Sequence, residues 1–263
     1  AALGSKVTVV EALPSLLSSA DKDLADIVVR RLKKEFAAVL CSTKVAAAEA
    51  TADGVRVTLA DDKNKETLET YAQVLVSVGR KPATEGLGLD AAGVRLSANG
   101  FIEADAQRRT SASHIFAIGD VTGQPMLAHK ASAEAKAAAD AVAGYPTKFE
   151  PKAIPSVVYT DPELAWCGIT ERDAQAKGMA VAVSKFPWMA SGRAMTQGRT
   201  DGMTKIIADA KSGVILGMGI AGIGAGELIA EGVLAVEKSL KAEDLELAIH
   251  PHPTLSETVM ETA

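Results

Sequence analysis

The sequence has few cysteines, and neither lies where redox chemistry or metal binding would need it. Only two occur in 263 residues, Cys41 and Cys167, and they are far apart, so there is no Cys-x-x-Cys pair or similar redox spacing. Each follows an apolar run, and we expect both to be buried, reduced thiols. No Cys/His cluster has metal-ligand spacing, because His250 and His252 lack an obvious third ligand. The sequence therefore predicts no metal site.

Long apolar runs and an excess of one charge are also missing. No apolar run approaches the ~20 residues that span a bilayer, so we expect no membrane span. The net charge is −5 with acids and bases interspersed, which argues against a nucleic-acid partner. Residues 1–4 contain no initiator methionine and no signal pattern, and we interpret them as a cut end. A hydrophobic content of 48% with 23% charged residues is typical of a globular chain, long enough for about two domains.

The most informative stretch is residues 250–257, which read His-Pro-His-Pro-Thr-Leu-Ser-Glu. His252 lies between two prolines, which stiffen the backbone, and a carboxylate follows at Glu257. A histidine whose second ring nitrogen is held by a carboxylate is suited to moving protons near neutral pH. The alternative is a capping box, in which Thr254 caps a helix and Glu257 reaches back to the Thr254 N–H. Spacing alone leaves both interpretations open.

The first region has the pattern of a nucleotide-binding half. A β-branched run predicts a buried strand over residues 6–11 that ends at Glu11, and apolar spacing predicts a helix over 21–36. Further strands are predicted over residues 37–45, 54–61 and 71–78. An acid at the tip of the second strand of a Rossmann unit binds the ribose hydroxyls of NAD, so Glu11 is a candidate ligand; the alternative is an exposed loop glutamate. The glycine fingerprint that cradles a pyrophosphate is absent from these residues.

The second region places an acid between a strand and a helix. Strands are predicted over residues 101–105 and 115–120, and an alanine-rich helix over 126–143. The second of these strands ends at Gly119 and Asp120, where backbone can approach a ligand and a carboxylate can accept a hydroxyl hydrogen bond. The amides at the helix start favour negative charge. A ligand crevice is one interpretation, and a plain turn with Asp120 capping a loop amide is the other.

The third region reads as an α+β domain. Prolines cluster between residues 146 and 155, which predicts a domain boundary near residue 150. Strands are predicted over residues 156–160, 164–169, 180–187, 203–209 and 214–221, and helices over 171–177, 227–239, 242–248 and 254–262. Strands followed by helices favour a sheet layered by helices.

A literal G-x-G-x-x-G motif lies within this third region, at residues 217–222. It follows a strand and precedes a helix, as a dinucleotide site would. However, residues 240–249 keep helical spacing, so the second strand of a βαβ unit is missing. The glycines are therefore interpreted as allowing a strand and a helix to pack closely.

Two of these stretches resemble motifs of a known family. Residues 250–257 resemble the active-site signature of the dihydrolipoamide dehydrogenases, flavoenzymes of the pyridine nucleotide-disulfide oxidoreductase family. Residues 110–120, Thr-Ser-x-x-His-Ile-Phe-Ala-x-Gly-Asp, resemble the second flavin motif of the same enzymes. Residues 159–163 and 186–194 are similar to segments of their interface domain. The resemblance covers nearly the whole chain.

The resemblance implies roles for the candidate residues. His252 corresponds to the acid–base, which deprotonates the substrate dithiol at the partner subunit's flavin and disulfide, and Glu257 to the residue that orients it. Asp120 corresponds to the ligand of the FAD ribitol chain. The helix start whose amides face the flavin pyrimidine edge corresponds to Met126, Leu127, Ala128 and His129. The positions that line the NAD site correspond to Glu11, Val45 and Gly79, and a glutamate at position 11 favours NAD over NADP.

The resemblance also implies an architecture and partners. We expect α/β Rossmann-like nucleotide-binding regions followed by an α+β interface domain. The expected domains are residues 1–82 (part of the NAD domain), 83–149 (returning segment of the FAD domain) and 150–263 (interface or dimerisation domain). The expected cofactors are FAD and NAD, and the expected substrate is dihydrolipoamide. The expected partners are a second copy of the chain and lipoyl-bearing 2-oxo acid dehydrogenase complexes, in the cytoplasm or, in a eukaryote, the mitochondrial matrix.

Two kinds of alternative stay open at this point. The first flavin motif and the redox cysteine pair of the family are not in this sequence, so we expect the chain by itself to be inactive. The first alternative to an enzyme is that the chain serves as a dimerisation or docking module. Within the enzymes, glutathione reductases share the layout but typically have one histidine before Pro-Thr, and mercuric reductases end in a cysteine pair.

Overall fold

The first elements form a βαβ unit. In the computed structural model, which describes residues 1–263, strands β1 (Thr8–Val10) and β2 (Ala38–Leu40) pair in parallel, with helix α1 (Lys22–Glu35) between them. Helix α1 buries Leu24, Val28 and Leu32 on one face, as the predicted periodicity required. The predicted first strand and helix are thus confirmed, and they supply the Rossmann-like part of the fold.

A separate antiparallel sheet follows, in the order β3-β4-β5. Its strands are β3 (Lys44–Thr51), β4 (Gly54–Ala60) and β5 (Glu66–Tyr71). The single strand predicted over residues 37–45 is wrong, because Ser42 has a φ of 50° and separates β2 from β3. The left-handed conformation of this residue ends one strand and redirects the chain into the next.

The buried strand predicted over residues 71–78 is also wrong. Strand β5 ends at Tyr71, and the residues after it form no strand. Leu75 and Val78 are 90% and 91% exposed. Residues 66–71 pair with β4, whereas no strand of this chain lies beside residues 72–78. An apolar run becomes a strand only where a neighbouring strand accepts its hydrogen bonds.

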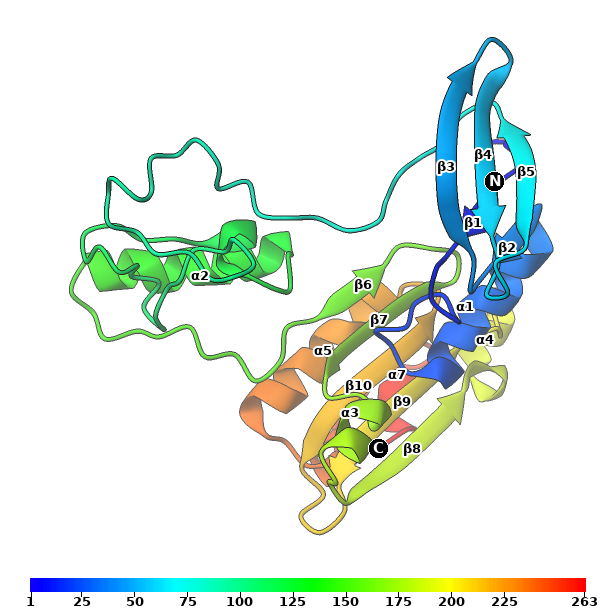
Figure 1. Ribbon diagram of the computed structural model, residues 1–263. Coiled ribbons are helices and arrows are strands. Elements are labelled where there is room, and N and C mark those ends of the chain that lie inside the picture. The colour runs from blue at the N-terminus through cyan, green and yellow to red at the C-terminus, as the bar shows by residue number, and fades with distance from the viewer. The chain divides into compact units, whose positions relative to one another are not determined.

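The C-terminal region is built on a five-stranded antiparallel sheet in the order β6-β7-β10-β9-β8 (Figure 1). Its strands are β6 (Ser156–Val158), β7 (Glu163–Gly168), β8 (Val181–Pro187), β9 (Met203–Asp209) and β10 (Ile215–Gly222). The helices are α3 (Glu171–Ala176), α4 (Gly192–Thr196), α5 (Ala225–Lys238), α6 (Ala242–Glu246) and α7 (Glu257–Met260), with a short 3₁₀ turn at Trp188–Ala190. All five predicted strands form, although the predicted last helix is shortened and α4 was not foreseen.

Helices cover both faces of this sheet. Met218 of β10 packs with Ile229 of α5 and Val259 of α7 in one core cluster. Leu164 of β7 packs with Leu24 of α1 in a second cluster, which lies on the opposite face because adjacent strand residues point to opposite sides. The βαβ unit and the C-terminal sheet therefore share a core, and residues 1–74 and 152–263 form one compact unit.

The glycines of the G-x-G-x-x-G stretch are packing positions, as predicted. A Cβ on Gly219 would lie 2.3 Å from Leu24 Cδ1 of helix α1, and one on Gly217 would lie 2.0 Å from the Ile169 carbonyl oxygen. A Cβ on Gly222 would likewise lie 2.3 Å from the ring of Trp188. Only glycine lets the strand meet these neighbours so closely.

Residues 75–151 form a second compact unit, which we describe separately. It contains the 3₁₀ helix η1 (Gly119–Thr122) and helix α2 (Ala128–Val142), with a small core around Val94, Ile102 and Ala117. The strands predicted over residues 101–105 and 115–120 are wrong. These residues make only isolated bridges, Leu96 to Ile102, Ala104 to Thr110 and Arg109 to Phe116, because no longer strand of the unit lies beside them.

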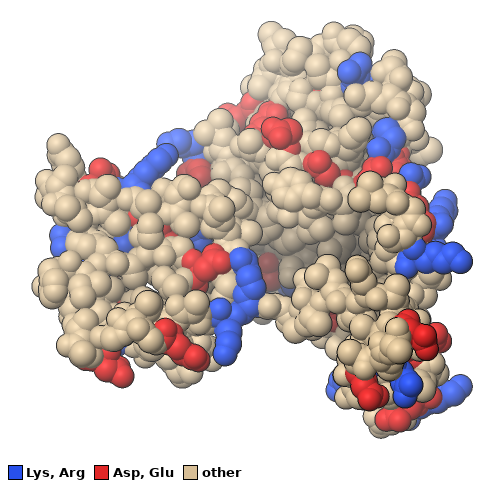
Figure 2. Space-filling model, turned by 90° about the horizontal axis from the view of Figure 1, so that it is seen from above, with Lys and Arg blue, Asp and Glu red and all other residues tan.

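The charged surface and the helix lengths add two general findings. Figure 2 shows acidic and basic side chains interspersed on the face in view, in keeping with the balanced composition. No helix combines the length and the apolar character that crossing a membrane requires.

Candidate functional site

His252 lies in the loop between helices α6 and α7, and its partner Glu257 is the first residue of α7. His252 Nδ1 is 2.8 Å from Glu257 Oε1, and the side chains are 78% and 21% exposed. An ionised carboxylate can only accept, so this contact places the ring proton on Nδ1 and leaves Nε2 with its lone pair. No protein group lies within hydrogen-bond distance of Nε2, so that atom is open to solvent or to a ligand.

Glu257 makes the contacts of both interpretations offered by the sequence. Its Oε1 holds His252, and its Oε2 accepts a hydrogen bond of 2.7 Å from the Thr254 N–H. The second contact is the reach-back half of a capping box. The other half is wrong, because helix α7 begins at Glu257 and Thr254 Oγ1 instead donates to the Pro251 carbonyl. The Thr254 N–H and His252 together hold the pKa of Glu257 below its usual range.

In the second unit, Gly119 and Asp120 form a turn directly before helix α2. Gly119 is buried with a φ of 79°, a conformation that favours glycine. Asp120 Oδ2 accepts a hydrogen bond of 2.8 Å from Arg80 Nη1, and the carboxylate is 44% exposed. Arg80 Nη2 also donates to the carbonyl of Met126. Arg80 therefore links the acid of the turn to the segment that starts the helix, a role that the sequence did not single out.

Glu134 of helix α2 joins this turn to the helix through a buried hydrogen bond. The side chain is 0% exposed, and its Oε2 accepts the Gly119 N–H at 2.6 Å. Its Oε1 lies 2.9 Å from Arg108 and 3.3 Å from Lys130, which compensate its charge. Sequence reasoning did not single out this residue; an acid four residues after Lys130 in an alanine-rich helix was the signal that could have identified it.

The start of helix α2 presents backbone amides that no side chain caps. Met126 is buried, Ala128 and His129 are exposed, and Leu127 is the N-cap without any side-chain capping bond. The first turn contains no acidic residue, so an anionic group would meet amide dipoles without repulsion. These amide donors fit an electron-accepting ring, and the half-exposed Asp120 carboxylate, close by in the chain, fits a polyhydroxyl chain as an acceptor. The individual FAD contacts stay predictions.

The predicted NAD positions are only partly brought together. Glu11 follows β1, and its carbonyl accepts a hydrogen bond of 3.0 Å from the Thr43 N–H, which brings it near Val45 at the start of β3. Its Oε1 accepts from the Leu13 N–H at 2.8 Å, and Val45 is 52% exposed. Gly79 has a φ of 113° and belongs to the other compact unit. The NAD contacts stay predictions.

The two cysteines differ in burial: Cys167 is buried, as predicted, whereas the prediction of a buried thiol is wrong for Cys41, which is half-buried just past the end of β2. Both Cys41 and Cys167 are free, and burial raises the pKa of the Cys167 thiol to about 12. The thiolate is the reactive form, so Cys167 is an unreactive core residue. No group of three or more His, Cys, Asp or Glu side chains is arranged to hold a metal ion.

Comparison with solved structures identifies the class of fold. The structure is similar to the crystal structure of LpdA from Mycobacterium tuberculosis, with a TM-score of 0.90 and 26% identity over 99% of this chain and 56% of that chain. It is equally similar to the HOCl-induced flavoprotein disulfide reductase RclA from Escherichia coli, with a TM-score of 0.90 and 27% identity over 98% of this chain and 59% of that chain. The fold is thus one found in flavoprotein disulfide reductases.

Family models make the assignment specific. Residues 1–135 match the pyridine nucleotide-disulphide oxidoreductase model, and residues 154–263 match the dimerisation domain of the same family. The chain therefore belongs to the pyridine nucleotide-disulphide oxidoreductase family. The predicted family and fold class are confirmed, whereas the predicted domain boundaries at residues 82 and 149 stay predictions.

Curated relatives carry one name. The chain is 47% identical over 259 residues to a dihydrolipoyl dehydrogenase of Buchnera aphidicola subsp. Schizaphis graminum, covering 98% of this chain and 54% of the relative. Identity to the dihydrolipoyl dehydrogenase of Vibrio parahaemolyticus is 46% over 98% and 54% of the two chains. Identity to the dihydrolipoyl dehydrogenase of Thermus scotoductus is 45%, covering 99% of this chain and 57% of the relative. The chain spans about half the length of the curated relatives it matches.

Proposed function

We propose that this chain works in a dihydrolipoyl dehydrogenase, which oxidises dihydrolipoamide and reduces NAD⁺ through FAD and a disulfide. The observation that carries the proposal is the His252–Glu257 pair, with Nδ1 held at 2.8 Å and Nε2 open on an exposed ring. Relatives at 45–47% identity that bear this enzyme's name support it. That the chain is inactive by itself is a separate prediction, and it stays a prediction.

The proposed role of the pair is to take a proton from the substrate. A thiol attacks a disulfide only as its thiolate, so one dihydrolipoamide S–H must lose its proton. His252 accepts this proton at Nε2 and becomes an imidazolium, whose charge the Glu257 carboxylate stabilises through Nδ1–H. The disulfide involves thiols other than Cys41 and Cys167, since one of these is unreactive and the two are not joined.

The proposed cofactors are FAD and NAD. FAD, when bound, supplies the electron path from the reduced disulfide to NAD⁺. Asp120 is proposed to accept a hydrogen bond from the ribitol chain. The amides from Met126 to His129 are proposed to face the flavin's pyrimidine edge, where they stabilise negative charge. Glu11, Val45 and Gly79 are proposed to line the NAD site, with Glu11 at the ribose.

The proposed assembly is a homodimer, supported by the match of residues 154–263 to a dimerisation domain. In it, His252 is proposed to act on the thiols bound by the partner subunit. Lipoyl-bearing components of 2-oxo acid dehydrogenase complexes are the proposed partners, with the cytoplasm or the mitochondrial matrix as the proposed compartment.

The test is His252→Gln in the FAD-loaded protein that contains this chain. Removal of the acid–base should lower kcat for dihydrolipoamide oxidation by about 10²–10⁴-fold. Oxidation of NADH by ferricyanide involves no substrate thiol and serves as the internal control, since it should be retained. A loss below tenfold in dihydrolipoamide turnover would remove His252 from the mechanism.

The dimerisation domain match also favours a second candidate, a docking or dimerisation module without turnover. Gel filtration combined with the same assay distinguishes the two. A stable dimer that binds FAD but never oxidises dihydrolipoamide would support the module. A glutathione reductase would instead reduce oxidised glutathione with NADPH.

A further inference from the structure

A second histidine–carboxylate pair lies on the same loop as His252. The His250 Nε2 is 2.8 Å from Glu231 Oε1 of helix α5, and its Nδ1 is 2.8 Å from the Ala248 carbonyl oxygen. The His250 side chain is only 8% exposed and that of Glu231 29%. Both ring nitrogens therefore face protein atoms, in contrast to His252, which keeps one nitrogen open.

The two partners of His250 define its protonation state. A carbonyl oxygen and an ionised carboxylate are both acceptors and carry no proton to donate. A neutral imidazole has only one N–H. One of the two contacts would then place the lone pair of a ring nitrogen against the lone pair of an acceptor oxygen. The imidazolium has two N–H donors and satisfies both contacts.

The electrostatics of the loop agree with a charged ring. Burial lowers the pKa of His250, but the Ala248 carbonyl and the Glu231 carboxylate outweigh it, so the pKa lies above its usual value. The acids that act on the ring are Glu231 of α5 and Glu257 of α7, both favouring the cation. Because the folded pKa is raised, the contact is fully present below the usual pKa of about 6.5 and is lost as the pH rises through the raised value.

We propose that the Glu231–His250 ion pair is a positioning device, which anchors the loop before residue 253 to helix α5 so that the His252 ring stays in place. Both ring nitrogens of His250 are engaged by protein acceptors, whereas His252, two residues later, keeps Nε2 open to exchange a proton. Glu231 and His250 act through His252 and touch no reacting atom themselves. The effect on catalysis rests on the proposed function, but the charge of His250 does not.

The charge is tested by ¹⁵N NMR on the histidine rings of the chain, which has four histidines that can be assigned with His→Gln variants. We expect the His250 titration midpoint to lie above the usual 6.5, with both ring nitrogens protonated below it. Glu231→Gln should shift its titration to lower pH. The matched control is Glu227→Gln, which removes an exposed carboxylate from the same helix and should leave the His250 titration unchanged.

The positioning role is tested in the FAD-loaded protein. Glu231→Gln should lower kcat for dihydrolipoamide by about tenfold with little change in KM, and Glu231→Asp should restore part of it, while Glu227→Gln has no effect. A wild-type His250 midpoint at or below 6.5, or a midpoint that Glu231→Gln leaves unchanged, overturns the ion pair. The wild-type spectrum decides this even if a variant does not fold. A charged His250 with unchanged turnover overturns only the positioning role, and absence of wild-type turnover would count against the proposed function alone.

Discussion

At the scale of single residues, the Glu257 carboxylate makes two hydrogen bonds to the loop that precedes helix α7. Glu257 orients the imidazole of His252 and also accepts a hydrogen bond from the Thr254 N–H, so the turn before helix α7 and the ring geometry depend on the same side chain. The sequence presented capping and catalysis as alternatives. The structure makes both contacts at once, because a carboxylate has two oxygens and can serve two donors.

A pH dependence follows for Glu257. Its pKa is lowered, mainly by the Thr254 N–H and then by His252, so its contacts contribute stability above the usual value of 4.5 and lose it as the pH falls through the folded pKa. Carboxyl ¹³C NMR should show a midpoint for Glu257 below 4.5. His252→Gln should move that midpoint upward. A wild-type midpoint at or above the usual value would contradict the geometry.

At the scale of elements, local pattern predicted those strands and helices whose partners lie in the same sheet. The five C-terminal strands pair with one another in one sheet, and α1 has a clear apolar face. The predicted strands over 71–78 and 115–120 failed for the opposite reason, since composition alone does not supply a hydrogen-bonding neighbour.

Strand β10 offers a test of element packing. Gly217→Ala would place a Cβ 2.0 Å from the Ile169 backbone oxygen, which cannot rotate away. We expect a loss of about 1–3 kcal/mol in the free energy of unfolding, measured in urea. The matched control is Gly192→Ala, where no atom lies within 4 Å of the new Cβ, and it should be neutral or slightly stabilising. Equal effects of the two variants would refute the packing interpretation.

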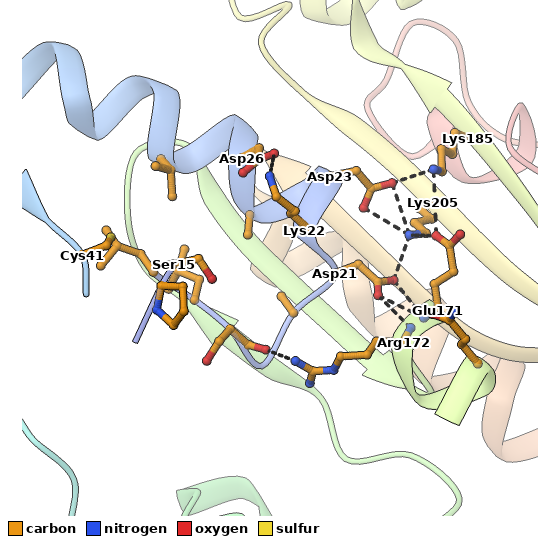
Figure 3. Close-up of a pocket in the computed structure, with 18 of the residues that line it drawn as sticks. Ser15, Asp21, Lys22, Asp23, Asp26, Cys41, Glu171, Arg172, Lys185 and Lys205 are labelled. Atoms are coloured by element: carbon orange, nitrogen blue, oxygen red, sulfur yellow. Dashed lines mark hydrogen bonds and ion pairs between the residues drawn. The ribbon is translucent and has the colours of Figure 1, made fainter. Parts of the chain in front are cut away.

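At the scale of the whole molecule, a buried lysine joins segments that are far apart in the chain. Lys205 of β9 is 1% exposed and lies 2.9 Å from Asp21, 3.1 Å from Asp23 and 2.5 Å from Glu171. Figure 3 shows these side chains meeting beside a cavity of about 740 Å³ between α1 and the C-terminal sheet. Burial lowers the pKa of Lys205, but its hydrogen bonds to Glu171 and Asp21 outweigh this and raise it.

Removal of this lysine should therefore loosen the first compact unit. Lys205→Met leaves Asp21 buried without its cation, which typically costs about 3–5 kcal/mol. Urea unfolding at pH 7 measures the loss, and Lys22→Met, at a lysine whose side chain is 81% exposed, serves as the control with an effect near zero. The difference should shrink at low pH, where the freed carboxyls take up protons. A loss below 1 kcal/mol would mean that apolar contacts alone hold α1 on the sheet.

The sequence by itself determined the family and the class of fold, and it predicted the residues that carry the proposed chemistry, because these depend on short motifs that can be recognised from residue spacing alone. It could not determine which groups support those residues. Glu134 behind the Gly119 turn, Arg80 on Asp120 and Glu231 on His250 come from other segments of the chain. Only folding brings them within hydrogen-bond distance, because partners that lie 15 to 40 residues apart in the sequence meet only in the tertiary structure.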